Sequence, residues 1–61
     1  MSTADYRYIA ATLFVDGWTA DEYILIKFEY GFSDAETRIV CDYLIALQRD
    51  SIVTELSEKN I

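Results

Sequence analysis

A six-residue pattern that occurs twice, fourteen residues apart, is the feature that most constrains the fold of this chain. Residues 17–22 (GWTADE) and 31–36 (GFSDAE) both read glycine, aromatic, hydroxyl residue, two spacers and glutamate. Glycine commonly ends a helix in the left-handed conformation. A Ser or Thr followed three residues later by Glu caps the start of a helix, and an apolar residue just before the cap can pack on its first turn. The pattern therefore predicts two helix boundaries rather than a catalytic motif. Ser2 with Asp5 is a weaker form of the same start signal.

Apolar residues with helical spacing support helices in the first and third segments of the chain. The first stripe consists of Tyr6, Ile9, Ala10, Leu13 and Phe14. The second stripe consists of Ile39, Val40, Tyr43, Leu44 and Leu47. Such spacing places side chains on one face of a helix. We therefore predict an all-α fold, a single small domain of residues 1–61 that forms oligomers, with three helices at about 3–15, 20–30 and 34–57.

The middle segment allows a second interpretation. Its apolar residues surround a helix almost completely, and they also alternate as they would in a β-strand. The alternative is an α+β fold, with a hairpin of residues 6–15 and 22–32 followed by a long helix. If the segment is a helix, its apolar residues must be buried centrally or between chains.

The third segment carries apolar residues on two sides. Cys41, Ile45, Ile52 and Leu56 are separated by four, seven and four residues, and they lie off the stripe of Val40 and Leu44. One long helix would then have two apolar faces, of which a small domain can cover only one. The alternative is a break near Asp50, followed by a short fourth helix.

Composition narrows the possible functions. One cysteine and no histidine exclude an internal disulfide and argue against zinc, so oligomerisation or a partner is the expected support for 61 residues. Eleven acidic and five scattered basic residues give a net charge of −6, with 52% hydrophobic residues. We therefore predict a folded acidic protein that binds neither nucleic acid nor membranes directly. No leader and no apolar run of about 18 residues is visible, so we predict a cytoplasmic location.

The sequence predicts no enzyme, no cofactor and no metal site. Histidine, the usual general acid or base at neutral pH, is absent. The carboxylates near the two turns fall in the first turns of predicted helices, where the helix dipole favours negative charge. Cys41 is followed by Asp42, which disfavours the thiolate that a nucleophile requires.

The spacing Gly31-Phe32-Ser33 between two predicted helices resembles the turn of DNA-binding helix-turn-helix repressors, over about 22 residues. The chain departs from that pattern at Lys27, where a small residue lets the helices cross, and at Thr37, where an apolar residue is expected. The first turn of the predicted helix after Ser33, which corresponds to the DNA-recognition helix, is acidic and would repel phosphates. The segments STADY (2–6) and SDAE (33–36) also resemble parts of the Hha-type nucleoid modulators, and we carry no activity or partner over from that short match.

We expect this chain to act through its surface, because nine aromatic residues exceed what so small a core needs. Four aromatic residues are assigned to the core, namely Tyr6, Phe14, Phe28 and Tyr43. The predicted partner-binding residues are Tyr8, Trp18, Cys41, Ile45, Ile52 and Leu56. The predicted acidic surface consists of Asp16, Asp21, Glu22, Asp34 and Glu36.

The leading hypothesis is a non-enzymatic regulator or inhibitor, a homodimer that binds another protein, with a basic protein as one candidate partner. A second hypothesis is an inhibitor that mimics DNA, of the kind carried by phages and mobile elements, with the acidic surface as its phosphate array. A third is a structural assembly subunit.

Overall fold

The computed structural model describes the backbone of residues 2–59 and the side chains of residues 2–52. Its elements are α1 (Thr3–Val15), a single 3-10 turn η1 (Ala20–Glu22), α2 (Tyr23–Tyr30) and α3 (Asp34–Lys59). The described residues form three α-helices and no strand, which confirms the all-α prediction. The two segments of the hairpin alternative lie mainly in α1 and α2. α3 continues without a break past Asp50, so the chain has one long third helix rather than two short ones.

The repeated pattern forms helix boundaries, as predicted. Gly17 and Gly31 have φ angles of 89° and 67°, the left-handed region that glycine enters without a Cβ clash. After Gly17, the Trp18 N–H donates to the Leu13 carbonyl at 2.9 Å, and after Gly31 the Phe32 N–H donates to the Lys27 carbonyl at 3.0 Å. These bonds satisfy carbonyls that the helix ends leave free. They also turn the chain sharply after α1 and after α2.

The helix starts differ in how completely they are capped. At α3, the Ser33 N–H donates to Glu36 Oε1 at 3.1 Å and the Glu36 N–H donates to Ser33 Oγ at 3.2 Å, which forms a full capping box. Ser2 and Asp5 form the same reciprocal pair at α1. The predicted helix at 20–30 instead begins as η1 and becomes α-helical only at Tyr23.

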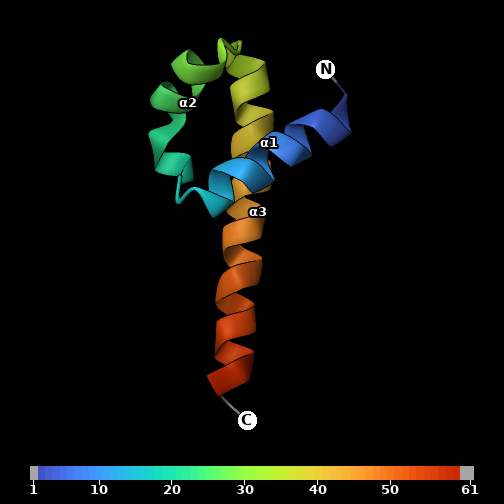
Figure 1. The fold of residues 1–61 in the computed structure, drawn as a ribbon, viewed down its shortest axis with the longest axis vertical. Coiled ribbons are helices and arrows are strands. Elements are labelled where there is room, and N and C mark those ends of the chain that lie inside the picture. The colour runs from blue at the N-terminus through green and yellow to red at the C-terminus, as the bar shows by residue number, and fades with distance from the viewer. Residues whose placement is uncertain (1, 60–61) are drawn as a thin grey trace.

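α3 is the longest element and the other helices pack on its first half (Figure 1). α1 crosses α3, and α2 lies alongside its beginning. The C-terminal half of α3 projects beyond both, which makes the molecule long and narrow, with extents of 43 × 21 × 16 Å.

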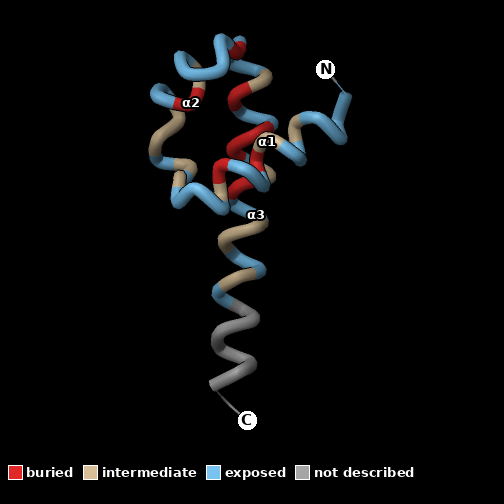
Figure 2. The backbone as a smooth tube through the Cα atoms, viewed as in Figure 1, coloured by how far each residue is buried: buried red, intermediate tan, exposed pale blue. Residues whose placement is uncertain are grey.

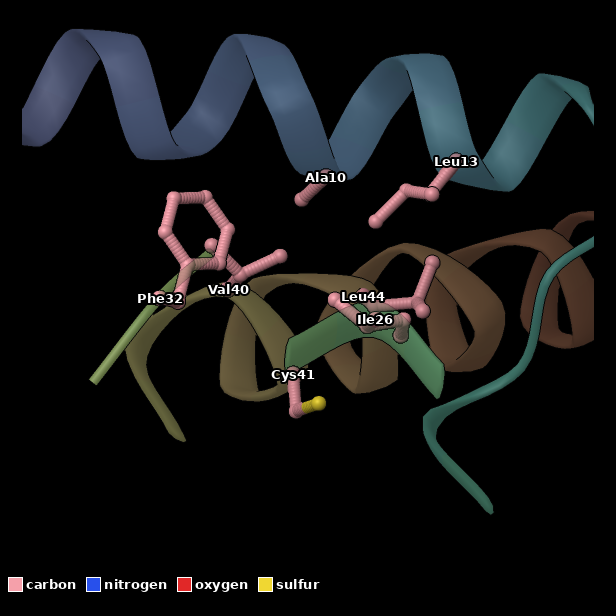
Figure 3. Close-up of a cluster of buried hydrophobic side chains, with 7 residues drawn as sticks. All are labelled: Ala10, Leu13, Ile26, Phe32, Val40, Cys41 and Leu44. Atoms are coloured by element: carbon pink, nitrogen blue, oxygen red, sulfur yellow. The ribbon is translucent and has the colours of Figure 1, made fainter. Parts of the chain in front are cut away.

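The core lies where the three helices meet. It consists of Ala10, Leu13, Ile26, Phe32, Val40, Cys41 and Leu44 (Figure 3). Thr37 is also fully buried, and its Oγ1 donates to the Ser33 carbonyl at 2.8 Å, so this buried hydroxyl has a hydrogen-bond partner. The aromatic side chains around Phe32 extend this core. The Tyr6 ring meets Phe32 edge-on at 6.2 Å, and the Tyr30 ring stacks on it at 5.2 Å between ring centroids.

Phe28 is a correction to the predicted core, because 77% of its surface is exposed. Tyr6, Phe14 and Tyr43, the other three aromatics assigned to the core, are partly buried and pack against it. The middle helix is not buried centrally either, since Ile26 is its only buried residue. The reason is geometric: α2 rests on the domain by one side only, and so small a core has room for one of its apolar faces.

A candidate partner-binding surface

Three large apolar side chains on α2 face away from the domain. Ile24, Leu25 and Phe28 are 65%, 57% and 77% exposed, whereas Ile26 is fully buried. Residues four apart lie above one another on a helix, so Ile24 and Phe28 form a row with Leu25 beside it, turned away from Ile26. Figure 2 shows α2 as largely exposed, with a buried segment where it meets the core. We call these three residues the α2 outer face.

Polar contacts to α3 hold α2 with this face outward. The Tyr23 hydroxyl donates to the Asp34 carbonyl at 2.9 Å. Lys27 Nζ forms an ion pair with Asp34 Oδ1 at 2.7 Å. That pair raises the pKa of Lys27 and lowers the pKa of Asp34, so both groups are charged at neutral pH. Because these contacts and Ile26 lie on the inner sides of α2, the outer face is directed toward solvent.

The predicted partner-binding residues of α3 do not all lie on its surface. Cys41 is buried, which differs from its assignment to a partner-binding face. Burial and the neighbouring Asp42 charge raise the pKa of its thiol. Ile45 and Ile52 are 42% and 57% exposed, and seven residues place them on the same side of α3. Leu56 lies outside the residues whose side chains the structure describes.

The two aromatic candidates have different surroundings. Tyr8 is 75% exposed on α1, as expected for a residue off the buried stripe. Trp18 is half-buried and packs against the core. Its position directly before Thr19 agrees with an apolar staple that fixes the path of the chain between two helices.

Three of the five predicted acidic residues have partners within the chain. Glu22 accepts a hydrogen bond from the Thr19 N–H at 3.1 Å, and Asp34 binds Lys27. Glu36 accepts one from the Ser33 N–H and, through Oε2, another from the Tyr6 hydroxyl at 3.0 Å. The bond from the Ser33 backbone is the main cause that lowers the pKa of Glu36, followed by the Tyr6 hydroxyl. Asp16 and Asp21, the remaining two, are exposed.

The described residues form no pocket, and no cluster of cysteine and carboxylate side chains among them could hold a metal ion. No helix in this part of the chain is long and apolar enough to cross a membrane. Comparison with protein-family models, curated proteins and solved structures gave no match.

Sequence reasoning anticipated excess apolar surface on the second and third segments, but it did not single out Ile24 or Leu25. The available signal was the all-round apolar character of residues 23–30. A helix of that kind in a 61-residue chain must leave some of its apolar side chains outside the core.

Proposed function

We propose that this protein is a small regulator or inhibitor, without chemistry of its own, that binds another protein through the α2 outer face. The observation that carries the proposal is the contrast within one short helix, where Ile26 is fully buried and Phe28 is 77% exposed. Clustered apolar side chains that the fold leaves in water are a common mark of protein-binding sites. The contacts of Tyr23 and Lys27 with Asp34 support the proposal, because a surface fixed before binding loses less entropy on association.

The exposed fractions set the scale of this binding. Complete burial of an Ile, Leu or Phe side chain contributes about 1.5–3 kcal/mol. The 57–77% of each side chain that is still exposed therefore offers about 1–2 kcal/mol, or about 3–6 kcal/mol for the whole α2 outer face. Association itself costs at least ~4 kcal/mol, so these three side chains alone do not give tight binding and the partner must make further contacts.

Substitution of Phe28 by serine tests this site, with Tyr8→Ser as a matched control. The proposal assigns binding to α2, and it therefore sets aside the sequence-based prediction that Tyr8, on α1, contacts the partner. Phe28 and Tyr8 are exposed aromatic residues of nearly equal exposure, 77% and 75%, on different helices. Tagged wild-type, Phe28→Ser and Tyr8→Ser chains are used to capture proteins from the native host. Each captured protein is then purified and titrated against the three chains by calorimetry. A partner that binds wild type and Tyr8→Ser equally, and Phe28→Ser much more weakly, supports the proposal.

The same experiment separates the other functions suggested by the sequence. A nucleic-acid enzyme whose binding is unaffected by Phe28→Ser and is lost at raised salt would replace the proposal with a DNA mimic. Large assemblies of the chain alone, growing with concentration, would indicate a structural subunit. The proposal retains the predicted cytoplasmic location.

We also propose that the chain is a homodimer, joined through Ile45 and Ile52 on α3. In an antiparallel pair of α3 helices related by a two-fold axis, Ile45 of one copy lies opposite Ile52 of the other. The same patch on each copy is then buried against its counterpart. Ile45→Asp or Ile52→Asp would then give monomers in light scattering. Ile39→Asp is the control, because Ile39 is 38% exposed on another side of the same helix. Monomeric wild-type chain at all concentrations would contradict this dimer.

A further inference from the structure

The charges around the α2 outer face are acidic. Asp21 is exposed in the turn that leads into α2, three residues before Ile24, and Glu29 is exposed directly after Phe28. Helical spacing places Asp21 at one end of the face and Glu29 along one flank. Lys27 is the only basic residue in the segment 20–30, and it is already paired with Asp34 on α3. The ion pair of Lys27 with Asp34 involves neither Asp21 nor Glu29.

We propose that the partner presents a basic amphipathic α-helix to the α2 outer face. This inference rests on the proposed function and adds the chemistry of the partner. Apolar side chains of such a helix would cover Ile24, Leu25 and Phe28, and its Lys or Arg side chains would reach the carboxylates of Asp21 and Glu29. Long basic side chains suit this arrangement, because their stems pack on apolar surface while their charged ends reach beyond it.

The size of the face fits a helix. The eight residues of α2 extend over about 12 Å. An amphipathic helix covers such a length with about two turns, and it presents apolar residues at i, i+3, i+4 and i+7. Helices pack at about 8–10 Å between axes, which brings the flanking side chains of one within reach of the other.

The acidic rim disfavours the other occupants. A second copy docked on this face would place its own Asp21 and Glu29 beside the first pair, four carboxylates in one contact, and like charges in an interface oppose binding. Nucleic acids and anionic membranes carry the same sign of charge and are repelled as well. A basic apolar segment of another protein satisfies both the apolar and the charged parts of the surface.

Designed peptides test the inference with the full chain. The probe is a helical peptide of about 14 residues with leucines on one stripe and lysines on both flanks. Two control peptides replace the lysines with glutamine or with glutamate. Titration calorimetry at low and high salt measures binding of all three peptides to the wild-type chain and to three variants: Phe28→Ser, Tyr8→Ser and the double substitution Asp21→Asn with Glu29→Gln.

We expect the lysine peptide to bind wild type about 2- to 30-fold more tightly than the glutamine peptide, from two exposed ion pairs. The glutamate peptide should bind most weakly. Phe28→Ser should weaken binding of the lysine peptide roughly 7- to 50-fold, because the peptide would bury the 77% of Phe28 that is exposed and serine lacks this apolar surface. Tyr8→Ser should leave binding unchanged. The double substitution should remove most of the preference for lysine and most of the salt dependence.

Two results would overturn the inference in different ways. If the glutamine peptide binds as tightly as the lysine peptide and remains sensitive to Phe28→Ser, the basic partner is refuted while the proposed binding site stands. If no peptide binds, or if Tyr8→Ser abolishes binding and Phe28→Ser does not, the basic-helix contact with the α2 outer face is refuted. The captured-partner experiment then decides the proposed function independently.

Discussion

Replacing Ile26 and Phe28 separately by alanine should affect the free energy of unfolding very differently. The two residues lie two positions apart on α2, and both are large and apolar. Ile26 is fully buried and belongs to the core, whereas Phe28 belongs to the α2 outer face. The comparison therefore tests whether the fold uses one side of α2 and leaves the other side for a partner.

The expected magnitudes follow from these exposures. Truncating a buried isoleucine to alanine costs about 2–5 kcal/mol, which is most of the ~3–5 kcal/mol that so small a core supplies. Phe28 is 77% exposed, so only 23% of its surface is covered in the fold. Removing that contact costs about 0.3–0.7 kcal/mol. Alanine has a higher helix propensity than phenylalanine by about 0.5 kcal/mol, so the net change for Phe28→Ala should be near zero.

Urea unfolding followed by far-UV circular dichroism measures both changes, and it should be carried out at several chain concentrations. A stability difference that grows with concentration reports self-association rather than the fold of one chain. At the lowest concentration, Phe28→Ala should unfold within about 0.5 kcal/mol of wild type, and Ile26→Ala should lose about 2–5 kcal/mol. A loss above about 1.5 kcal/mol for Phe28→Ala, or equal losses for both variants, would refute the assignment of the two faces.

Three further predictions concern the helix ends and the buried thiol. The folded pKa of Glu36 is below its ordinary value of 4.5, so the carboxylate stabilises the fold above about pH 4.5, and this contribution is lost as the pH falls through the folded pKa. As the pH is lowered, the urea midpoint should therefore fall less steeply for Glu36→Gln than for wild type or for the exposed control Glu29→Gln. Cys41 should react slowly with a thiol reagent at neutral pH and rapidly in urea, since burial protects it and raises its pKa; equal rates would contradict its place in the core. Gly31→Ala should lower the free energy of unfolding by about 1–2 kcal/mol in urea titrations, because its φ of 67° disfavours any residue with a Cβ, although open space surrounds the site; an unchanged urea midpoint would mean that Gly31 does not end α2 in this way.

The helix boundaries could be predicted from the sequence because local chemistry determines them. Gly17 and Gly31 adopt the left-handed conformation, and Ser33 with Glu36 forms the predicted capping box. These devices involve residues within a few positions of one another, so a single sequence contains the information. The first helix was predicted at 3–15 and is found there.

The buried face of α2 could not be predicted, because a helix that is apolar all round has no preferred side. Packing against α3 selects Ile26 and leaves Phe28 outside, and that choice depends on residues distant in the sequence. The hydrogen bond from Tyr6 to Glu36 could not be predicted from the sequence either, because it joins residues thirty positions apart. Thr37 stands where the helix-turn-helix pattern expects an apolar residue, yet its hydroxyl donates to the Ser33 carbonyl and the side chain is fully buried.

If the fold leaves the α2 outer face in water, solvent should reach its three side chains in the free chain. NMR spectra recorded with an inert paramagnetic cosolute at low chain concentration report how closely solvent approaches each side chain. Signals of Ile24, Leu25 and Phe28 should broaden first, while those of Ile26 and Leu44 should be protected. If the signals of Phe28 and Ile24 are as protected as those of Ile26 in the monomer, another part of the chain covers the α2 outer face, and this face is not available to a partner.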